Sequence, residues 1–329
     1  ALVIDMSKHK ADQAGENIKP KHIYANPYCP EVCPILALAL HIFSNTFRLD
    51  NDDRSLIFMG TPYDVFSKWL PTALETIDGL SYDICDFGTH SFRKGVATYS
   101  AGFIGGPSIV AIFQRACWSL GQVQDRYFMY SDGGDQLCGR VACGLNFNGG
   151  AKFSVLPPHF ASTSILTDEQ WEDICPCYKQ YPTGFQACLP YFLASLTHHY
   201  DWLTEKEANG NLKNISAAHP FFLSRIVTSG IIPRVKEVLL ELNTSGRCEN
   251  TGMTATGIPM HTDLHREIEL IREVNSSLTK QCCANHAEVM TQLPEKVANV
   301  VMENVRVEGA RDFTLTAMRD MIRAELVQH

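Results

Sequence analysis

The stretch "GTHSFRKGVATYS", residues 88–100, places His90 and Arg93 three positions apart where a helix is expected to begin. Thr89 suits the N-cap of that helix, because its hydroxyl can accept a hydrogen bond from an N–H group of the first turn. Side chains three positions apart lie on one face of a helix. His90 and Arg93 are therefore either ordinary polar residues in the first turn of a surface helix or a site that binds a negatively charged group.

The segments before this stretch predict a small β element and two helices. Apolar runs at residues 2–6 and 21–25 flank a polar loop, which predicts a β-hairpin with a long, basic-tipped connection. The chain begins at Ala1 inside the first of these runs and without a methionine, so we expect it to be a fragment that lacks N-terminal sequence. Residues 35–45, "ILALALHIFSN", are apolar around most of a helix and predict a buried helix. Residues 63–75 have apolar positions at helical spacing and predict a second one.

The segments after it predict a mainly helical chain. The glycine-rich residues 131–160 predict a loop with short extended pieces, and residues 161–243 predict helices. Glycine, serine and threonine predict a linker at residues 243–259, and a long helical pattern covers residues 261–306. The predicted fold class is therefore mainly α with a small β-hairpin or sheet, an α+β arrangement.

Composition narrows the classes of function. The net charge of the 329 residues is −8, which argues against a nucleic-acid binder that is basic over its whole surface. A local basic site stays possible, because charges are screened beyond about 8 Å at physiological salt. No run of 18 apolar residues is present, so we expect no membrane span.

The twelve cysteines are irregularly spaced in a long chain, unlike those of a disulfide scaffold. We therefore expect free thiols, a reducing compartment and a protein that is not secreted. No spacing typical of a zinc site recurs, so we expect no metal and no cofactor.

Five residues at loop tips and helix ends combine into one chemistry, the transfer of a DNA phosphodiester to a tyrosine hydroxyl. They are Lys10, His90, Arg93, Trp118 and Tyr127.

Each of these residue types has a role in such a transfer. The attacked phosphate gains negative charge, which the planar guanidinium of Arg93 can meet with two hydrogen bonds. Tyrosine has a pKa of about 10, so Tyr127 needs a base, and His90 can accept its proton. Lys10 can protonate the leaving 5′ oxygen. Trp118 can only donate a hydrogen bond and packs the wall of the site.

The motifs "HSFRKG" at residues 90–95 and "RACWSLGQVQDRYF" at 115–128 resemble the catalytic core of the tyrosine recombinases of the phage-integrase superfamily. The stretch "GDQLCGR" at 134–140 brings the resemblance nearest to the Crypton-type recombinases of eukaryotic transposons. It implies DNA cleavage and rejoining through a 3′-phosphotyrosine, with double-stranded DNA rather than a small molecule as substrate. By position, Lys10 resembles the hairpin lysine, His90 and Arg93 the His-x-x-Arg pair, Trp118 the His/Trp position and Tyr127 the nucleophile.

The resemblance covers about residues 1–145, which we expect to be a partial catalytic domain. Residues 146–256 are then a helical and loop-rich extension, and residues 257–329 a long-helix segment. The family's first arginine precedes the hairpin, whereas Arg48 and Arg54 follow it. We therefore expect the chain to be a partial catalytic domain that lacks this arginine and is deficient in activity on its own.

Several alternatives stay open. Lys8 is placed as well as Lys10 in the hairpin loop, and Tyr130 competes with Tyr127, although the spacing from Trp118 favours Tyr127. Lys8, Lys94, Arg115 and Arg126 are candidate contacts to DNA phosphates. The chain can also be a DNA-binding protein that has lost such chemistry, or a helical scaffold that self-assembles.

The long helical pattern bears on assembly. Its apolar positions follow a 4-3-3-4 spacing, which predicts either a short coiled coil or a helix packed on the body: Leu264, Ile268, Ile271, Val274 and Leu278. Recombination of this type needs several protomers, so we expect self-association on DNA. We expect the protein to act in the nucleus if the host is a eukaryote and in the cytoplasm if it is a prokaryote.

Overall fold

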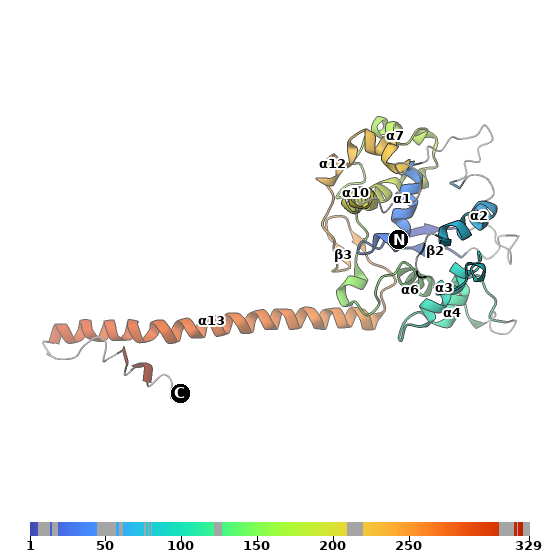
Figure 1. The fold of residues 1–329 in the computed structure, drawn as a ribbon. Coiled ribbons are helices and arrows are strands. Elements are labelled where there is room, and N and C mark those ends of the chain that lie inside the picture. Colours follow the sequence, from blue (N-terminus) through green and yellow to red (C-terminus); the bar gives the residue numbers. More distant parts are fainter. Residues whose placement is uncertain are drawn as a thin grey trace. The chain divides into compact units, whose positions relative to one another are not determined.

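The computed structural model describes residues 1–5, 14, 19–44, 57–58, 62–75, 77, 79, 81–121, 127–208, 220–308, 319–320 and 322–324. The chain divides into two compact units, Ala1–Asp263 and Leu264–His329 (Figure 1). Residues 1–145 and 146–256 thus lie in one compact unit. Most of the described residues are helical, which confirms the predicted fold class. None of the helices in these ranges is long and apolar enough to cross a membrane.

The predicted hairpin strands are present. β1 (Leu2–Ile4) and β2 (Lys21–Ile23) pair antiparallel, with Val3 opposite His22. The residues at the tip of the connection, Lys8 and Lys10 among them, lie outside the described residues. A second small sheet joins β3 (Arg247–Cys248) to β4 (Met253–Thr254).

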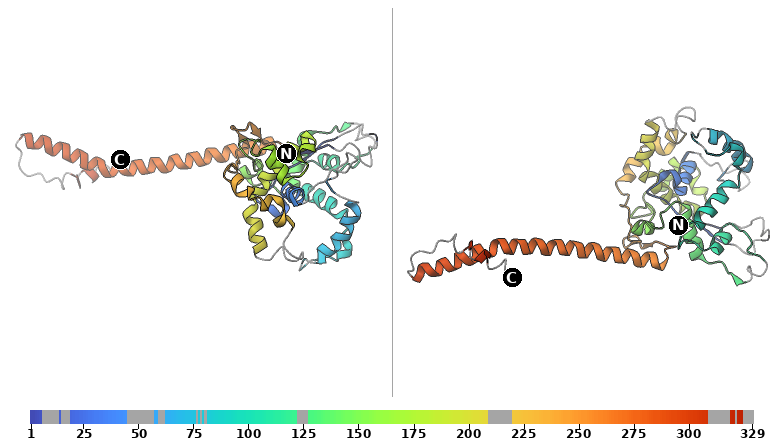
Figure 2. Two further views of the ribbon diagram at one scale, coloured as in Figure 1. Left: turned by 90° about the horizontal axis from the view of Figure 1, so that it is seen from above. Right: turned by 60° about the horizontal axis from the view of Figure 1, so that its bottom comes forward.

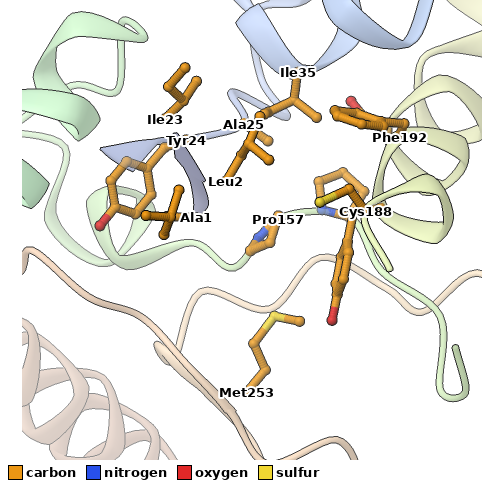
Figure 3. A pocket seen from close by; sticks show the side chains of 14 residues that line it. Ala1, Leu2, Ile23, Tyr24, Ala25, Ile35, Pro157, Cys188, Phe192 and Met253 are labelled. Atoms are coloured by element: carbon orange, nitrogen blue, oxygen red, sulfur yellow. The ribbon is translucent and has the colours of Figure 1, made fainter. Parts of the chain in front are cut away.

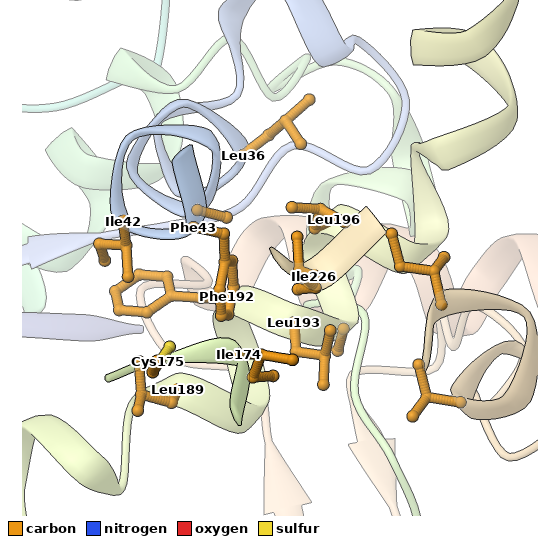
Figure 4. Close-up of a cluster of buried hydrophobic side chains, with 14 of the residues drawn as sticks. Leu36, Ile42, Phe43, Ile174, Cys175, Leu189, Phe192, Leu193, Leu196 and Ile226 are labelled. Carbon is orange, nitrogen blue, oxygen red and sulfur yellow. The ribbon is translucent and has the colours of Figure 1, made fainter. Parts of the chain in front are cut away.

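The main core forms around α1 (Pro34–Ser44), the buried helix predicted at residues 35–45. Leu36, Ala39 and Phe43 of α1 pack on α9 (Leu189–His198), whose side chains are almost all buried (Figure 4). Both helices are apolar on most of their surface because the other helices of this unit surround them.

The helices predicted within residues 161–243 complete this core. Thr167 begins the first of them with a capping box, in which its hydroxyl and the Gln170 side chain each bond the other's backbone N–H. The helices are α7 (Asp168–Ile174), α8 (Thr183–Gln186), α9, α10 (Tyr200–Ala208), α11 (Arg225–Thr228) and α12 (Ile231–Lys236).

A second group of helices contains the sequence motifs. It consists of α2 (Pro62–Glu75), α3 (Ser91–Ala101), α4 (Ile109–Arg115) and α6 (Asp132–Ala142). α3, α4 and α6 lie against one another in Figure 1, and Figure 2 shows the same group from two further directions. α2 confirms the helix predicted at residues 63–75, and its Phe66 contacts Phe92 of α3 edge to face.

The loop prediction for residues 131–160 is wrong for α6. Glycines weaken a helix in isolation, but here they allow close packing. A Cβ on Gly139 would lie 2.3 Å from the carbonyl oxygen of His22, and one on Gly134 would lie 3.1 Å from Ala111. α6 therefore packs directly on β2 and α4 because these positions have no side chain.

The linker prediction for residues 243–259 is also wrong. Besides the β3–β4 sheet, long-range hydrogen bonds tie this segment to the rest of its unit. The Tyr24 hydroxyl bonds the Thr256 hydroxyl at 2.7 Å, and Leu156 N–H donates to the Asn243 carbonyl at 2.9 Å. The predicted long helix follows as α13 (Met260–Glu308).

Candidate functional site

His90 and Arg93 lie at the start of α3. The N-cap is His90 rather than Thr89, and the His90 side chain makes no capping hydrogen bond. The Ser91 hydroxyl instead accepts a hydrogen bond from Gly88 N–H at 3.0 Å, which shifts the helix start by one residue. The N–H groups of the first turn are therefore not capped by the N-cap side chain.

This helix start is exposed and positive. His90, Arg93 and Lys94 are all exposed, and within the described residues the His90 and Arg93 side chains form no hydrogen bond or ion pair. Uncapped N–H groups and the helix dipole favour an anion at such an end. The first turn of α3 can therefore accept a phosphate without breaking an internal contact.

Trp118 is positioned by the end of α4. Cys117 adopts the left-handed conformation with φ 55°, Cys117 N–H donates to Gln114 O at 3.2 Å, and Trp118 N–H donates to Phe113 O at 2.9 Å. These two bonds form a Schellman motif. The apolar contact that usually accompanies this motif is present, because the centres of the Trp118 and Phe113 rings are 5.4 Å apart. Trp118 is thus half-buried and held at one place beside α4.

The two competing tyrosines differ in their surroundings. Tyr127 is 78% exposed. Tyr130 donates a hydrogen bond from its hydroxyl to Pro20 O at 2.5 Å, and the Lys21 ammonium lies 5.4 Å from its ring centre. Burial raises the pKa of Tyr130 above its ordinary value. Tyr130 is therefore a structural residue, whereas the hydroxyl of Tyr127 is accessible.

A buried carboxylate links β2, α4 and α6. Asp135 accepts hydrogen bonds from His22 N–H at 2.8 Å and lies 2.9 Å from Arg115 Nη1 and 3.9 Å from Lys21 Nζ. Arg115 Nη2 also donates to His22 O at 3.0 Å. Burial lowers the pKa of Lys21, while the charge of Asp135 opposes that shift. Arg115, a candidate contact to DNA, is thus engaged inside the fold.

The second charged residue of "GDQLCGR" is buried as well. Arg140 donates to Thr256 O at 2.5 Å and to Phe153 O at 2.8 Å, and its guanidinium lies 4.6 Å from the Tyr24 ring centre. The buried roles of Asp135 and Arg140 were not predicted from the sequence. Their signal is the spacing of Gly134, Cys138 and Val141 in α6, which matches one helix face.

The structure brings the helices of the candidate residues together but not all of the residues. A small cluster of Ala97 from α3, Ala111 and Ile112 from α4, and Cys138 from α6 joins these three helices. Within the described ranges, no hydrogen bond, ion pair or ring contact joins Tyr127 to His90, Arg93 or Trp118. Lys8, Lys10 and Arg126 fall outside the described ranges.

A cavity of about 450 Å³ lies elsewhere in the same unit, between the hairpin and α9 (Figure 3). Apolar side chains such as Leu2, Ile23 and Phe192 line most of it, and His90, Arg93 and Tyr127 do not. An apolar cavity does not suit a phosphodiester, so the exposed start of α3 is the better candidate site.

All twelve cysteines are free thiols. In the described part of the chain, no three His, Cys, Asp or Glu side chains form a group that could hold a metal ion.

The chain matches no protein-family model, and no curated protein or solved structure is significantly similar to it. The assignment of a function therefore depends on the residues and their geometry.

Proposed function

We propose that this chain cleaves and rejoins DNA strands through a 3′-phosphotyrosine intermediate, in the recombination or integration of a mobile element. The observation that carries the proposal is the contrast between the two tyrosines. Tyr127, at the spacing from Trp118 that the motif requires, is exposed, whereas the Tyr130 hydroxyl is engaged by Pro20. The uncapped, positive start of α3 supports it, because the reaction needs a phosphate held there.

In this proposal the Tyr127 oxygen attacks the phosphorus atom, the bond to the 5′ oxygen breaks, and the 3′ side stays bonded to the tyrosine. His90 accepts the proton of the tyrosine, and Lys10 protonates the departing 5′ oxygen. Arg93 donates to the non-bridging oxygens, where charge develops; losing one such donor typically costs about 2.7–4 kcal/mol of barrier. Trp118 donates one hydrogen bond or packs the wall beside the phosphate. Rejoining is the reverse reaction with a new 5′ hydroxyl.

The partners follow from this chemistry. We propose double-stranded DNA as substrate, self-association on it, and a nuclear site of action in a eukaryote. The second candidate is a DNA-binding protein without the chemistry; the absence of a described contact between Tyr127 and Arg93 is the observation that favours it.

The test uses a library of nicked duplexes of random sequence, incubated with the chain joined to the upstream region that the resemblance implies, and separated on a denaturing gel. We expect a covalent adduct with the unaltered chain and with Tyr130→Phe, and none with Tyr127→Phe, while all three bind DNA alike. An adduct that persists in Tyr127→Phe overturns the assignment of the nucleophile. DNA binding without an adduct in any of the three overturns the proposed reaction and supports the second candidate.

A further inference from the structure

One face of α13 carries an apolar stripe that is exposed along its length. The side chains are between 37% and 61% exposed: Leu264, Ile268, Ile271, Leu278, Val289, Leu293, Val297 and Val300. Scattered exposed apolar residues are ordinary, but two groups of them at helical spacing on one helix, Leu264–Leu278 and Val289–Val300, are not. Covering this stripe with a complementary surface would remove a large apolar area from water.

The spacing of the stripe is that of a coiled-coil seam. When Asn275 rather than the neighbouring, likewise exposed Val274 is taken as the seam residue, the positions from Leu264 to Cys282 alternate in steps of four and three, as heptads require. Leu264, Ile271 and Leu278 take the d positions, and Ile268, Asn275 and Cys282 take the a positions. After Cys282 the seam continues through His286, with extra four-residue steps that unwind a coiled coil locally. The heptad spacing therefore covers about two heptads, and from Leu278 to Val300 the steps follow an 11-residue repeat, which unwinds the supercoil.

We propose that residues 264–300 of α13 form one strand of a parallel, in-register, two-stranded coiled coil with a second copy of this chain. The proposal does not rest on the DNA chemistry. The seam of α13 can form a dimer whether or not Tyr127 reacts with DNA.

Charge and polarity identify the partner as a second copy. Glu267 takes a g position and Arg272 the following e position. In a parallel pair in register, Glu267 of each strand faces Arg272 of the other. Asn275, at an a position, meets its own counterpart across the axis only in that register, which is the known use of a single seam asparagine. An antiparallel pair with full overlap would place Glu267 near Val297 instead.

Near its C-terminal end, α13 has two buried positions and one ion pair beside the stripe. Pro294 and Ala298 are buried, and Arg319 forms an ion pair with Glu295 at 2.8 Å. At about 100° per residue, Ala298 lies about 100–160° around the helix from Leu293, Val297 and Val300, whereas Pro294 lies about 60° from Val297. Leu293, Val297 and Val300 are nevertheless between 37% and 58% exposed.

The first test is the mass of the full chain by light scattering at about 20 µM without DNA. We expect a dimer, and we expect Ile271→Lys to raise the dissociation constant at least about 100-fold. Leu270→Lys is the matched control, because Leu270 is exposed, adjacent and outside the seam. A monomeric unaltered chain, a trimer, or equal effects of the two substitutions would overturn the proposal.

The second test fixes the orientation by disulfide formation. Helix axes about 8–10 Å apart with Cα atoms about 2.3 Å from each axis bring two facing a positions to about 3.4–5.4 Å, which overlaps the disulfide range of about 4.4–6.8 Å. Asn275→Cys, in a chain with Cys282→Ser and Cys283→Ser, should therefore form a disulfide dimer under mild oxidation. In the antiparallel pair the two Cα atoms would be about 21 Å apart along the axis, and no crosslink would form.

Two controls complete this test. The Cys282→Ser, Cys283→Ser chain should give no disulfide dimer. With the native cysteines, Cys283→Ser should still crosslink through Cys282, and Cys282→Ser should not, because Cys283 points away from the axis. A crosslink at Cys283 alone would contradict the proposed seam.

The charge pair gives a third readout. Glu267→Arg and Arg272→Glu should each weaken the dimer several-fold, and the double exchange should restore it. Failure of the double exchange to recover affinity would contradict the parallel register.

Discussion

The close packing of α6 on β2 predicts a large effect of adding a single methyl group at Gly139. Elsewhere in a helix, Gly→Ala stabilises by about 1 kcal/mol. At Gly139 the new Cβ would lie 2.3 Å from His22 O and 3.1 Å from the Tyr24 ring, so the strand has to move by about 1 Å. That carbonyl also accepts the hydrogen bond from Arg115, so the movement disturbs the buried Asp135 cluster.

The expected magnitude follows from these contacts. Overpacking costs about 1–3 kcal/mol, and a weakened hydrogen bond to a charged group costs about 1.5–3 kcal/mol. After the gain in helix propensity, we expect Gly139→Ala to lower the free energy of unfolding by about 1.5–5 kcal/mol. Gly95→Ala in α3 is the control, because nothing lies within 4 Å of the added Cβ, and it should stabilise by about 1 kcal/mol.

The assay is urea unfolding followed by tryptophan fluorescence. The four tryptophans lie within Ala1–Asp263, so the signal reports on that unit. The reasoning is refuted if Gly139→Ala unfolds at the same urea concentration as the unaltered chain or at a higher one.

Three further predictions concern single side chains, each measured by urea unfolding. Cys117→Gly should stabilise by about 1 kcal/mol because it relieves the left-handed strain after α4; a loss of stability would contradict the Schellman motif. Asp135→Asn should destabilise by about 3 kcal/mol because Arg115 and Lys21 lose their buried counter-charge; an unchanged midpoint would contradict the cluster. Burial lowers the pKa of His199 to about 4, so the unfolded chain binds a proton between about pH 6.5 and 4 that the folded chain does not. The free energy of unfolding is therefore unaffected by His199 above about pH 6.5 and falls by up to about 3 kcal/mol as the pH is lowered towards 4. His199→Gln should reduce the dependence of the free energy of unfolding on pH over this range. An equal pH dependence in both chains would refute the prediction.

Local patterns predicted the elements that depend on local sequence. The hairpin was predicted from two apolar runs around a polar loop, α1 from a run that is apolar around most of a helix, and α2 and α13 from apolar residues at helical spacing. α3 was predicted from Gly88 and a capping residue before its first turn. α6 could not be predicted in this way, because the glycines that argue against a helix are required by the neighbouring β2 and α4.

Long-range contacts explain the other failures. The order of residues 243–259 comes from Tyr24 and Arg140, more than 100 positions away, and no local pattern contains that information. The candidate site was predictable as a set of residue types and spacings. The difference between Tyr127 and Tyr130 was not, because it depends on the Pro20 carbonyl and on Lys21.

The most direct test of the proposed chemistry is to identify the atom that becomes bonded to DNA. The adduct from nicked duplexes would be digested with nuclease and trypsin, and the peptide that ends at Arg140 would be fragmented in a mass spectrometer. This peptide contains both Tyr127 and Tyr130, so the fragment masses discriminate between them. We predict a nucleotide 3′-phosphate on the oxygen of Tyr127. A nucleotide on Tyr130, on another residue, or attached through its 5′ end would contradict the account.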